Sequence, residues 1–197
     1  MIGSYDFCGH YEWSFAWLEK LGGSDLVHQY WDEGIGRDSQ SHARDLIIAE
    51  GIPGMTKYWQ HTLAEEAAGY TSTSDEKYFR IDMTKCPSKG FLLQNKLEQY
   101  PDYCDHCIGW VGSIMKDAGY IIDHEHNHCG QCWWEYRKST DPSPPSEPGA
   151  FSGEKDVRTQ PTWVSLGQPI DVFQRATTAN QKVRVSNKSI PSGIAKG

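Results

Sequence analysis

A proline-rich stretch limits which part of this chain can fold into one compact core. Residues 139–149 hold four prolines in eleven positions. Proline fixes φ and removes a backbone donor, so this stretch favours a linker or an extended arm over a helix or a central strand. The larger apolar residues that follow are too sparse for a second core. The sequence therefore predicts a domain over residues 1–138 and a Pro-rich linker with an extended arm over residues 139–197.

The two parts also differ in charge. Residues 1–138 carry 12 basic and 21 acidic side chains, whereas residues 139–197 carry 7 and 5. A net charge of −7 argues against nucleic-acid binding, which normally needs a basic surface. The mean hydropathy of −0.64, with no apolar run near the length of a bilayer span, argues against a membrane protein.

The expected location and assembly follow from the two ends of the chain. The first residues show no charged segment followed by an apolar one, so we expect no secretory signal, a cytoplasmic protein and reduced thiols. An arm of this composition gains order by packing on its own core or on a neighbouring subunit. A homo-oligomer is therefore one expectation.

Hydrophobic periodicity predicts helices first and strands later. Apolar residues at helical spacing predict helices over residues 11–21, 25–33, 41–50 and 56–68. The second half predicts a strand at 78–83, helices at 91–98 and 101–118, and a hairpin with strands at 120–126 and 132–137. This order favours an α+β fold with N-terminal helices packed on a small antiparallel sheet.

Side chains with reactive or metal-binding chemistry gather in one region. Five of the six cysteines and four of the eight histidines lie between Cys86 and Cys132. Two C-x-x-C pairs there predict a structural zinc site, because each pair can supply two of the four thiolates of a tetrahedral ion. The four ligands in this interpretation are Cys104, Cys107, Cys129 and Cys132.

Three alternating histidines offer a different ligand set. His124 and His126 fall on one face of a strand, and His128 follows in the turn. Two imidazoles with a cysteine or carboxylate can hold zinc or another divalent transition metal with one open position. The alternative is a polar hairpin tip with solvated histidines.

A third interpretation is a reactive thiol. Cys104 and Cys107 fall near the predicted start of a helix, where the positive end of the helix dipole favours a thiolate. Cys86, at the end of a strand, and Cys132, on the hairpin, can approach the same place. The alternative is ordinary buried cysteine, which is common.

One segment resembles a known family. The run Tyr78-Phe79-Arg80-Ile81-Asp82-Met83-Thr84-Lys85-Cys86-Pro87 is similar to a strand that leads into a Cys-Pro in the L-2-amino-thiazoline-4-carboxylic acid hydrolase-like family. Cys104 and the aromatic strand from Cys132 match later pieces, so the resemblance covers roughly residues 75–138. It implies an α+β domain and hydrolytic opening of a thiazoline ring, with Cys86, Cys104 and Cys132 carried over. Cys107, Cys129 and the histidine run depart from the family pattern.

These observations together predict a hydrolase or lyase for a small heterocyclic or amino-acid-like substrate. Cys104 is the leading nucleophile, with Cys86 beside it, and His124 and His126 are acid–base groups or metal ligands. Asp82 or Asp105 is expected to orient a histidine. The alternative is a regulatory or structural module that binds zinc or a small molecule through the C-x-x-C pairs.

Overall fold

Helices fill the N-terminal half of the chain, as the apolar spacing predicts. The computed structural model describes residues 10–95, 100–126, 130–143 and 183–186. The first elements are α2 (His10–Gln29), η1 (Tyr30–Ser39), α3 (Ser41–Glu50) and α4 (Ile52–Glu65). None of the described helices is long and apolar enough to cross a bilayer.

Glycine kinks the first helix without ending it. The predicted stop at Gly22-Gly23 is a break inside α2, where Gly23 takes φ 74° and ψ −175° and the helix then resumes. Glycine adopts this backbone without a Cβ penalty. From Tyr30 the coil widens into the π-helix η1, whose end is closed by a bond from the Gln40 amide to the Ile35 carbonyl oxygen, five residues back. The predicted helix over 25–33 is therefore divided between α2 and η1.

Five antiparallel strands form the sheet, in the order β1-β2-β4-β3-β5. Their bounds are β1 (Gly69–Ser74), β2 (Tyr78–Lys85), β3 (Tyr120–His126), β4 (Cys132–Lys138) and β5 (Val183–Ser186). The predicted hairpin is confirmed as β3 and β4, while β1 was not predicted because its sequence, GYTSTS, lacks apolar alternation. Together with the helices, this sheet confirms the α+β class.

Two further helices connect the strands. The helix α5 (Pro87–Asn95) begins four residues before the predicted segment, because Pro87 suits the first helical position. The helix α6 (Asp105–Asp117) begins four residues after the predicted start at Pro101. Both starts therefore fall directly after a cysteine, Cys86 before α5 and Cys104 before α6.

Most of the predicted arm lies outside the described residues. Its described strand, β5, pairs antiparallel with β3 of the same chain, with Val183 opposite His126. This pairing places one part of the arm on the domain's own sheet. Packing of the arm on a neighbouring subunit, and with it the homo-oligomer, stays a prediction.

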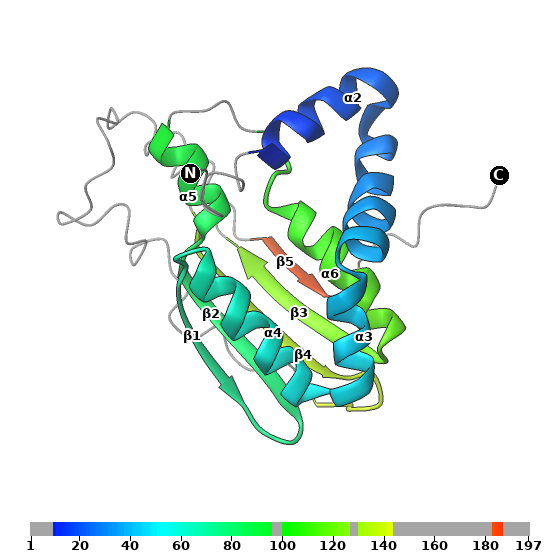
Figure 1. Cartoon of the computed structure of the whole chain (residues 1–197), viewed down its shortest axis with the longest axis vertical. Helices are drawn as coiled ribbons and strands as arrows, with labels where there is room; N and C mark the ends of the chain where they lie inside the picture. The colour runs from blue at the N-terminus through cyan, green and yellow to red at the C-terminus, as the bar shows by residue number, and fades with distance from the viewer. Residues whose placement is uncertain (1–9, 96–99, 127–129, 144–182, 187–197) are drawn as a thin grey trace.

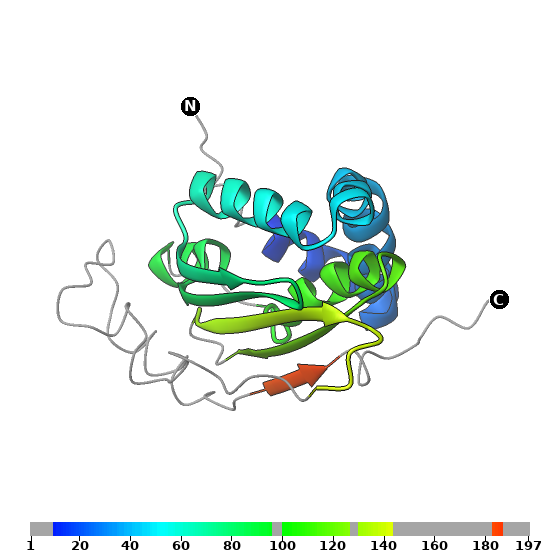
Figure 2. The ribbon, with the colours of Figure 1, turned by 90° about the horizontal axis from the view of Figure 1, so that it is seen from below.

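The described helices all lie on one side of the sheet (Figure 1; Figure 2). Alternate residues of β2, β3 and β4 point to that side and join α3, α4 and α6 in the main core, among them Ile81, Ile122 and Trp134. A second cluster, centred on Phe15 and Trp31, packs α2 and η1 against Tyr100 and Tyr103. The tyrosines and tryptophans of the helices are therefore mainly core residues.

The other side of the sheet carries a network of charged side chains. Arg80 makes a bidentate contact with Asp82 at 2.7 and 2.8 Å and reaches Glu135 at 3.2 Å. Arg137 pairs with Asp123 at 2.6 Å. The Arg80 guanidinium carbon also lies 4.6 Å from the centroid of the Trp133 ring. Because these charges are buried, the loss of one partner is expected to cost more than the loss of an exposed ion pair.

Adjacent isoleucines of α3 provide a matched test of the core. Ile47 is 0% exposed and Ile48 is 56% exposed, so the two share a helix but not an environment. We expect Ile47→Ala to lower the free energy of unfolding by about 2–5 kcal/mol through lost burial and a residual cavity. Ile48→Ala should change it by about 0.5 kcal/mol or less. Urea unfolding followed by circular dichroism measures both, and equal effects would contradict this packing.

Candidate functional site

The cysteines and histidines meet at a small internal cavity where β3 ends and β4 begins. The cavity has a volume of about 30 Å³, which has room for about one water molecule. The starts of α5 and α6 form its other walls. The lining residues are Cys86, Lys89, Tyr103, Cys104, His106, Cys107, His124, His126, Gly130, Gln131, Cys132 and Trp134.

Two of the lining cysteines directly precede a helix. The Cys86 sulfur accepts a hydrogen bond from the Lys89 amide in the first turn of α5, at 3.4 Å. The Cys86 amide donates to the Gly130 carbonyl oxygen at 2.8 Å, which ties this helix start to the segment just before β4. Cys104 is the N-cap residue of α6. Both sulfurs therefore lie near the positive end of a helix, which favours a thiolate.

His126 is held as an imidazolium. Its Nε2 donates to the Asp105 carboxylate oxygen Oδ1 at 3.0 Å, across the junction of β3 and α6. Burial alone would lower the pKa of His126, but hydrogen bonds with Asp105 and with the Cys104 thiol raise it from 6.5 to about 9. The arrangement places a charged imidazole beside the Cys104 sulfur, with a carboxylate to orient it.

The surroundings of His124 favour its neutral form. Its Nδ1 donates to the Trp133 carbonyl oxygen at 2.9 Å, and its ring stacks on Trp134 with centroids 3.7 Å apart. Burial, together with the charge of His126, lowers the pKa of His124 well below its ordinary value. The Nε2 atom is buried and has no hydrogen-bond partner. A neutral imidazole with this tautomer presents a lone pair that can accept a proton.

The other two described cysteines are neutral thiols. Burial raises the pKa of Cys107 and of Cys132 well above the ordinary value, and the neighbouring cysteines add to both shifts. Cys132 accepts a hydrogen bond from the Trp134 indole at 3.2 Å, and Cys107 lies 3.5 Å from Nε2 of His106. The four thiols around the cavity thus fall into two pairs of different chemistry.

The structure unites most of the predicted site. Cys86, Cys104, His124 and His126 all line the cavity, but Asp82 does not, because it lies on the other side of the sheet and pairs with Arg80. Asp105, the second predicted carboxylate, makes the contact with His126. Of the two predicted carboxylates, Asp105 contacts a histidine and Asp82 contacts an arginine instead.

The metal predictions depend partly on residues that the structure does not describe. Cys129 and His128 lie outside the described residues. Within the described ranges, no group of three or more His, Cys, Asp or Glu side chains is arranged to hold a metal ion. Cys104, Cys107 and Cys132 do line one cavity, so the zinc site stays a prediction.

Sequence reasoning missed several lining residues. Lys89 is only 4% exposed, and its Nζ lies 5.8 Å from the centroid of the Tyr103 ring. Lysine is usually exposed, so nothing in the local pattern marked this one as a cavity residue. Gln131 is also buried, directly before Cys132. His106 is packed among Tyr11, Phe15 and Tyr103, and burial lowers its pKa.

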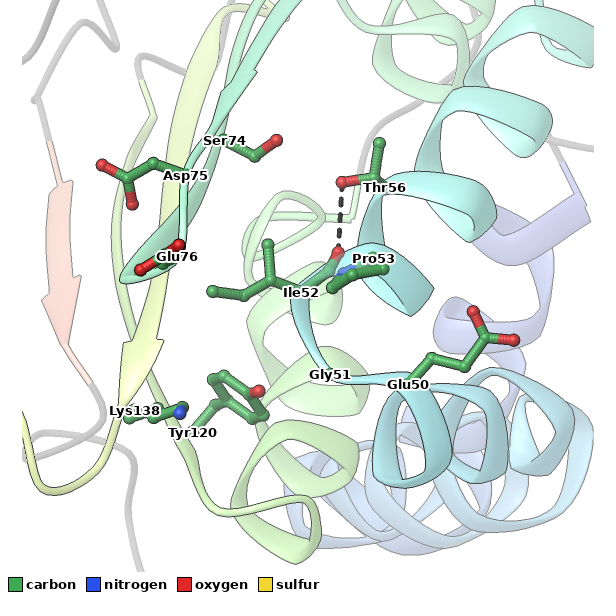
Figure 3. Close-up of a pocket in the computed structure, with 10 residues that line it drawn as sticks. All are labelled: Glu50, Gly51, Ile52, Pro53, Thr56, Ser74, Asp75, Glu76, Tyr120 and Lys138. Carbon is green, nitrogen blue, oxygen red and sulfur yellow. Dashed lines mark hydrogen bonds between the residues drawn. The ribbon is translucent and has the colours of Figure 1, made fainter.

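A larger pocket lies at the opposite end of the sheet (Figure 3). It has a volume of about 590 Å³ and is lined by Tyr120, Lys138 and residues of the α3–α4 and β1–β2 connections, with no cysteine or histidine. Two of its carboxylates, Glu50 and Asp75, make local contacts. Glu50 pairs with Lys57 at 2.5 Å, and Asp75 accepts hydrogen bonds from two amides of its own turn. The smaller cavity is therefore the better candidate for catalysis.

The ion pair between His126 and Asp105 predicts a pH-dependent stability. The pKa of His126 is about 9 in the folded state, above the ordinary 6.5 of the unfolded chain, so the folded state binds this proton more tightly. The resulting stabilisation is complete below pH 6.5 and is lost as the pH rises to about 9. We expect Asp105→Asn to cost about 1–3 kcal/mol at pH 6 and clearly less at pH 9.5. Urea unfolding at both pH values measures this difference.

Asp102→Asn is the control for that measurement, because Asp102 is an exposed carboxylate three residues earlier. Its effect should be the same at both pH values. A cost of Asp105→Asn that did not change with pH would contradict the charged state of His126.

Comparisons with known proteins add no family assignment. No protein-family model, curated protein or solved structure matches this chain. The resemblance to thiazoline-ring hydrolases therefore stays an expectation drawn from short motifs. The functional argument rests on the geometry and protonation of the cavity residues.

Proposed function

We propose that this protein is a hydrolase that opens a small ring substrate by attack of the Cys104 thiolate on an electrophilic carbon. The single observation that carries the proposal is the pair of histidines in one cavity, where His126 is hydrogen-bonded to Asp105 and Nε2 of His124 is buried with no hydrogen-bond partner. The first environment raises the pKa of His126, and the second lowers the pKa of His124. Environments that push two titratable groups in opposite directions typically assign one as the acid and the other as the base. The resemblance to thiazoline-ring hydrolases favours a thiazoline as the ring.

The first step would use Cys104 and His126. The thiolate forms a bond to the C=N carbon, the π electrons move to the ring nitrogen, and His126 donates a proton there. The C=N bond then re-forms while the ring C–S bond breaks, and the leaving sulfur takes up that proton, so the ring opens with its carbon still bound to Cys104. Asp105 keeps the imidazole in position through the hydrogen bond of 3.0 Å that it accepts from Nε2 of His126. This arrangement corresponds to a nucleophile, an acid–base group and an orienting carboxylate.

The second step would use His124. Its unpaired Nε2 accepts a proton from a water molecule, and the resulting hydroxide attacks the same carbon. His124 passes this proton to the substrate nitrogen. The bond to Cys104 then breaks as the C=O bond forms, the hydroxyl proton goes to His126, and the thiolate returns. The cavity has room for about one water at this place. A five-membered ring needs more space, so the proposal requires the cavity to widen when substrate binds.

The same proposal places the protein in the cytoplasm. A thiolate nucleophile needs a reducing compartment to stay reduced.

A thiazoline panel tests the proposed activity. The purified full chain is incubated with small thiazolines with and without an amino or carboxylate substituent, and mass spectrometry detects a product heavier by one water. We expect turnover of at least one member. Cys104→Ser should lower kcat/KM by about 10³-fold or more, and His124→Asn by about 10²–10⁴-fold.

Cys107→Ala is the matched control, because Cys107 lines the same cavity as a neutral thiol outside these steps. It should change kcat/KM by less than about tenfold. Full activity in Cys104→Ser would overturn the nucleophile. Binding of a thiazoline by calorimetry with no product from any panel member would favour the alternative of a small-molecule-binding module.

A further inference from the structure

Two helices that each follow a cysteine begin at one cavity. Cys86 precedes α5 and Cys104 precedes α6, and both side chains line the cavity that also holds the two strand histidines. The proposed hydrolysis uses Cys104 alone. The Cys86 sulfur accepts a hydrogen bond from the first-turn amide of Lys89. Cys86 is therefore a second thiol in electropositive surroundings, and the proposed reaction gives it no role.

The charges around the cavity separate this pair from the other two thiols. The buried Lys89 and the imidazolium of His126 are cations in the lining and favour anionic sulfur. Cys107 and Cys132 are kept protonated by burial. Among the described cysteines, Cys86 and Cys104 are thus the two suited to oxidation, because susceptibility follows thiolate character.

The cavity also suits a particular oxidant. About 30 Å³ admits a molecule close to the size of water, and hydrogen peroxide is such a molecule. Nε2 of His124, which is 1% exposed and has no hydrogen-bond partner, can accept a hydrogen bond from a peroxide O–H. This buried acceptor is an observation independent of the helix termini, and it indicates a small polar occupant.

We propose that Cys104 and Cys86 form a reversible disulfide when hydrogen peroxide enters this cavity, which makes the site oxidation-sensitive. The proposal deepens the proposed function and rests on it, since Cys104 serves as the nucleophile in both. In the oxidised chain no thiolate remains at Cys104 to attack a substrate, so hydrolysis stops until a thiol reductant restores it.

The chemistry balances in two steps. The Cys104 thiolate attacks one oxygen of the peroxide, the O–O bond breaks, and the leaving hydroxide takes a proton from His126 to become water. Cys104 is now a sulfenic acid, and the peroxide has been reduced. The Cys86 thiolate then attacks the Cys104 sulfur, the S–S bond forms, the S–O bond breaks, and a second hydroxide leaves.

Peptide mapping of the whole protein tests this disulfide. The reduced full chain is treated with hydrogen peroxide, alkylated, and digested with trypsin and Asp-N. Trypsin cuts after Lys89 and Lys96, and Asp-N cuts before Asp105, so Cys86, Cys104 and Cys107 fall on separate peptides. We expect a linked peptide pair containing Cys86 and Cys104, lighter by two hydrogen atoms and separated by dithiothreitol. The bulkier tert-butyl hydroperoxide should form it more slowly.

Two variants complete the test. In the Cys86→Ser variant, oxidation should stop before disulfide formation, with Cys104 carrying one or more oxygen atoms. Cys132→Ser, which changes a neutral thiol of the same cavity, should still form the disulfide. A link from Cys104 to Cys107 or Cys132, oxygen accumulating on Cys104 while Cys86 stays reduced in the wild type, or no oxidation at either residue would each overturn the proposal.

The mapping needs no substrate, so the two proposals can fail separately. Thiazoline turnover that depends on Cys104, without a peroxide-induced link, would reject only the disulfide. A peroxide-induced link between Cys86 and Cys104 in a chain that hydrolyses no thiazoline would reject only the proposed hydrolysis.

Discussion

The contact between Asp105 and His126 joins the two halves of the site. It connects the first residue of α6 with the last residue of β3 at 3.0 Å, so it fixes the helix start against the end of the sheet. The same contact holds a positive charge on His126, and that charge helps to keep His124 neutral. This ion pair therefore favours the charged form of His126, and that charge adds to burial in favouring the neutral form of His124.

Burial and helix ends likewise divide the four thiols into two that favour the neutral form and two that favour the thiolate. Burial favours the neutral form of Cys132, and also of Cys107 although Cys107 lies in the first turn of α6, whereas Cys86 and Cys104 directly precede the positive ends of two helices. The residue types alone do not make this distinction, because all four are cysteines within one stretch of sequence. The packing of α5 and α6 against β3 and β4 gives each sulfur its chemistry.

The sequence predicted that several cysteines and histidines gather in one place, but not all the residues that line the cavity or their electrostatics. Alternation over Tyr120–His126 predicted a strand with His124 and His126 on one face, and the pairing of β3 with β4 brings Cys132 opposite His126. Lys89 could not be predicted, because its burial depends on the packing of α5. The strand β1 lacked an apolar pattern. Asp82 was misplaced because a carboxylate of alternating β2 can face either side, and here it faces Arg80.

The alternation along β3 has a consequence for how this protein can evolve. His124 and His126 face the helices, while Asp123 pairs with Arg137 and Glu125 accepts from Trp133 on the other side. Replacing one residue would alter one of these contacts. Deleting one residue inside the strand would reverse every later side chain, turning the imidazoles toward the arginines and the carboxylates toward the thiols. Descendants of this chain can therefore vary in residue identity along β3 far more readily than in its length.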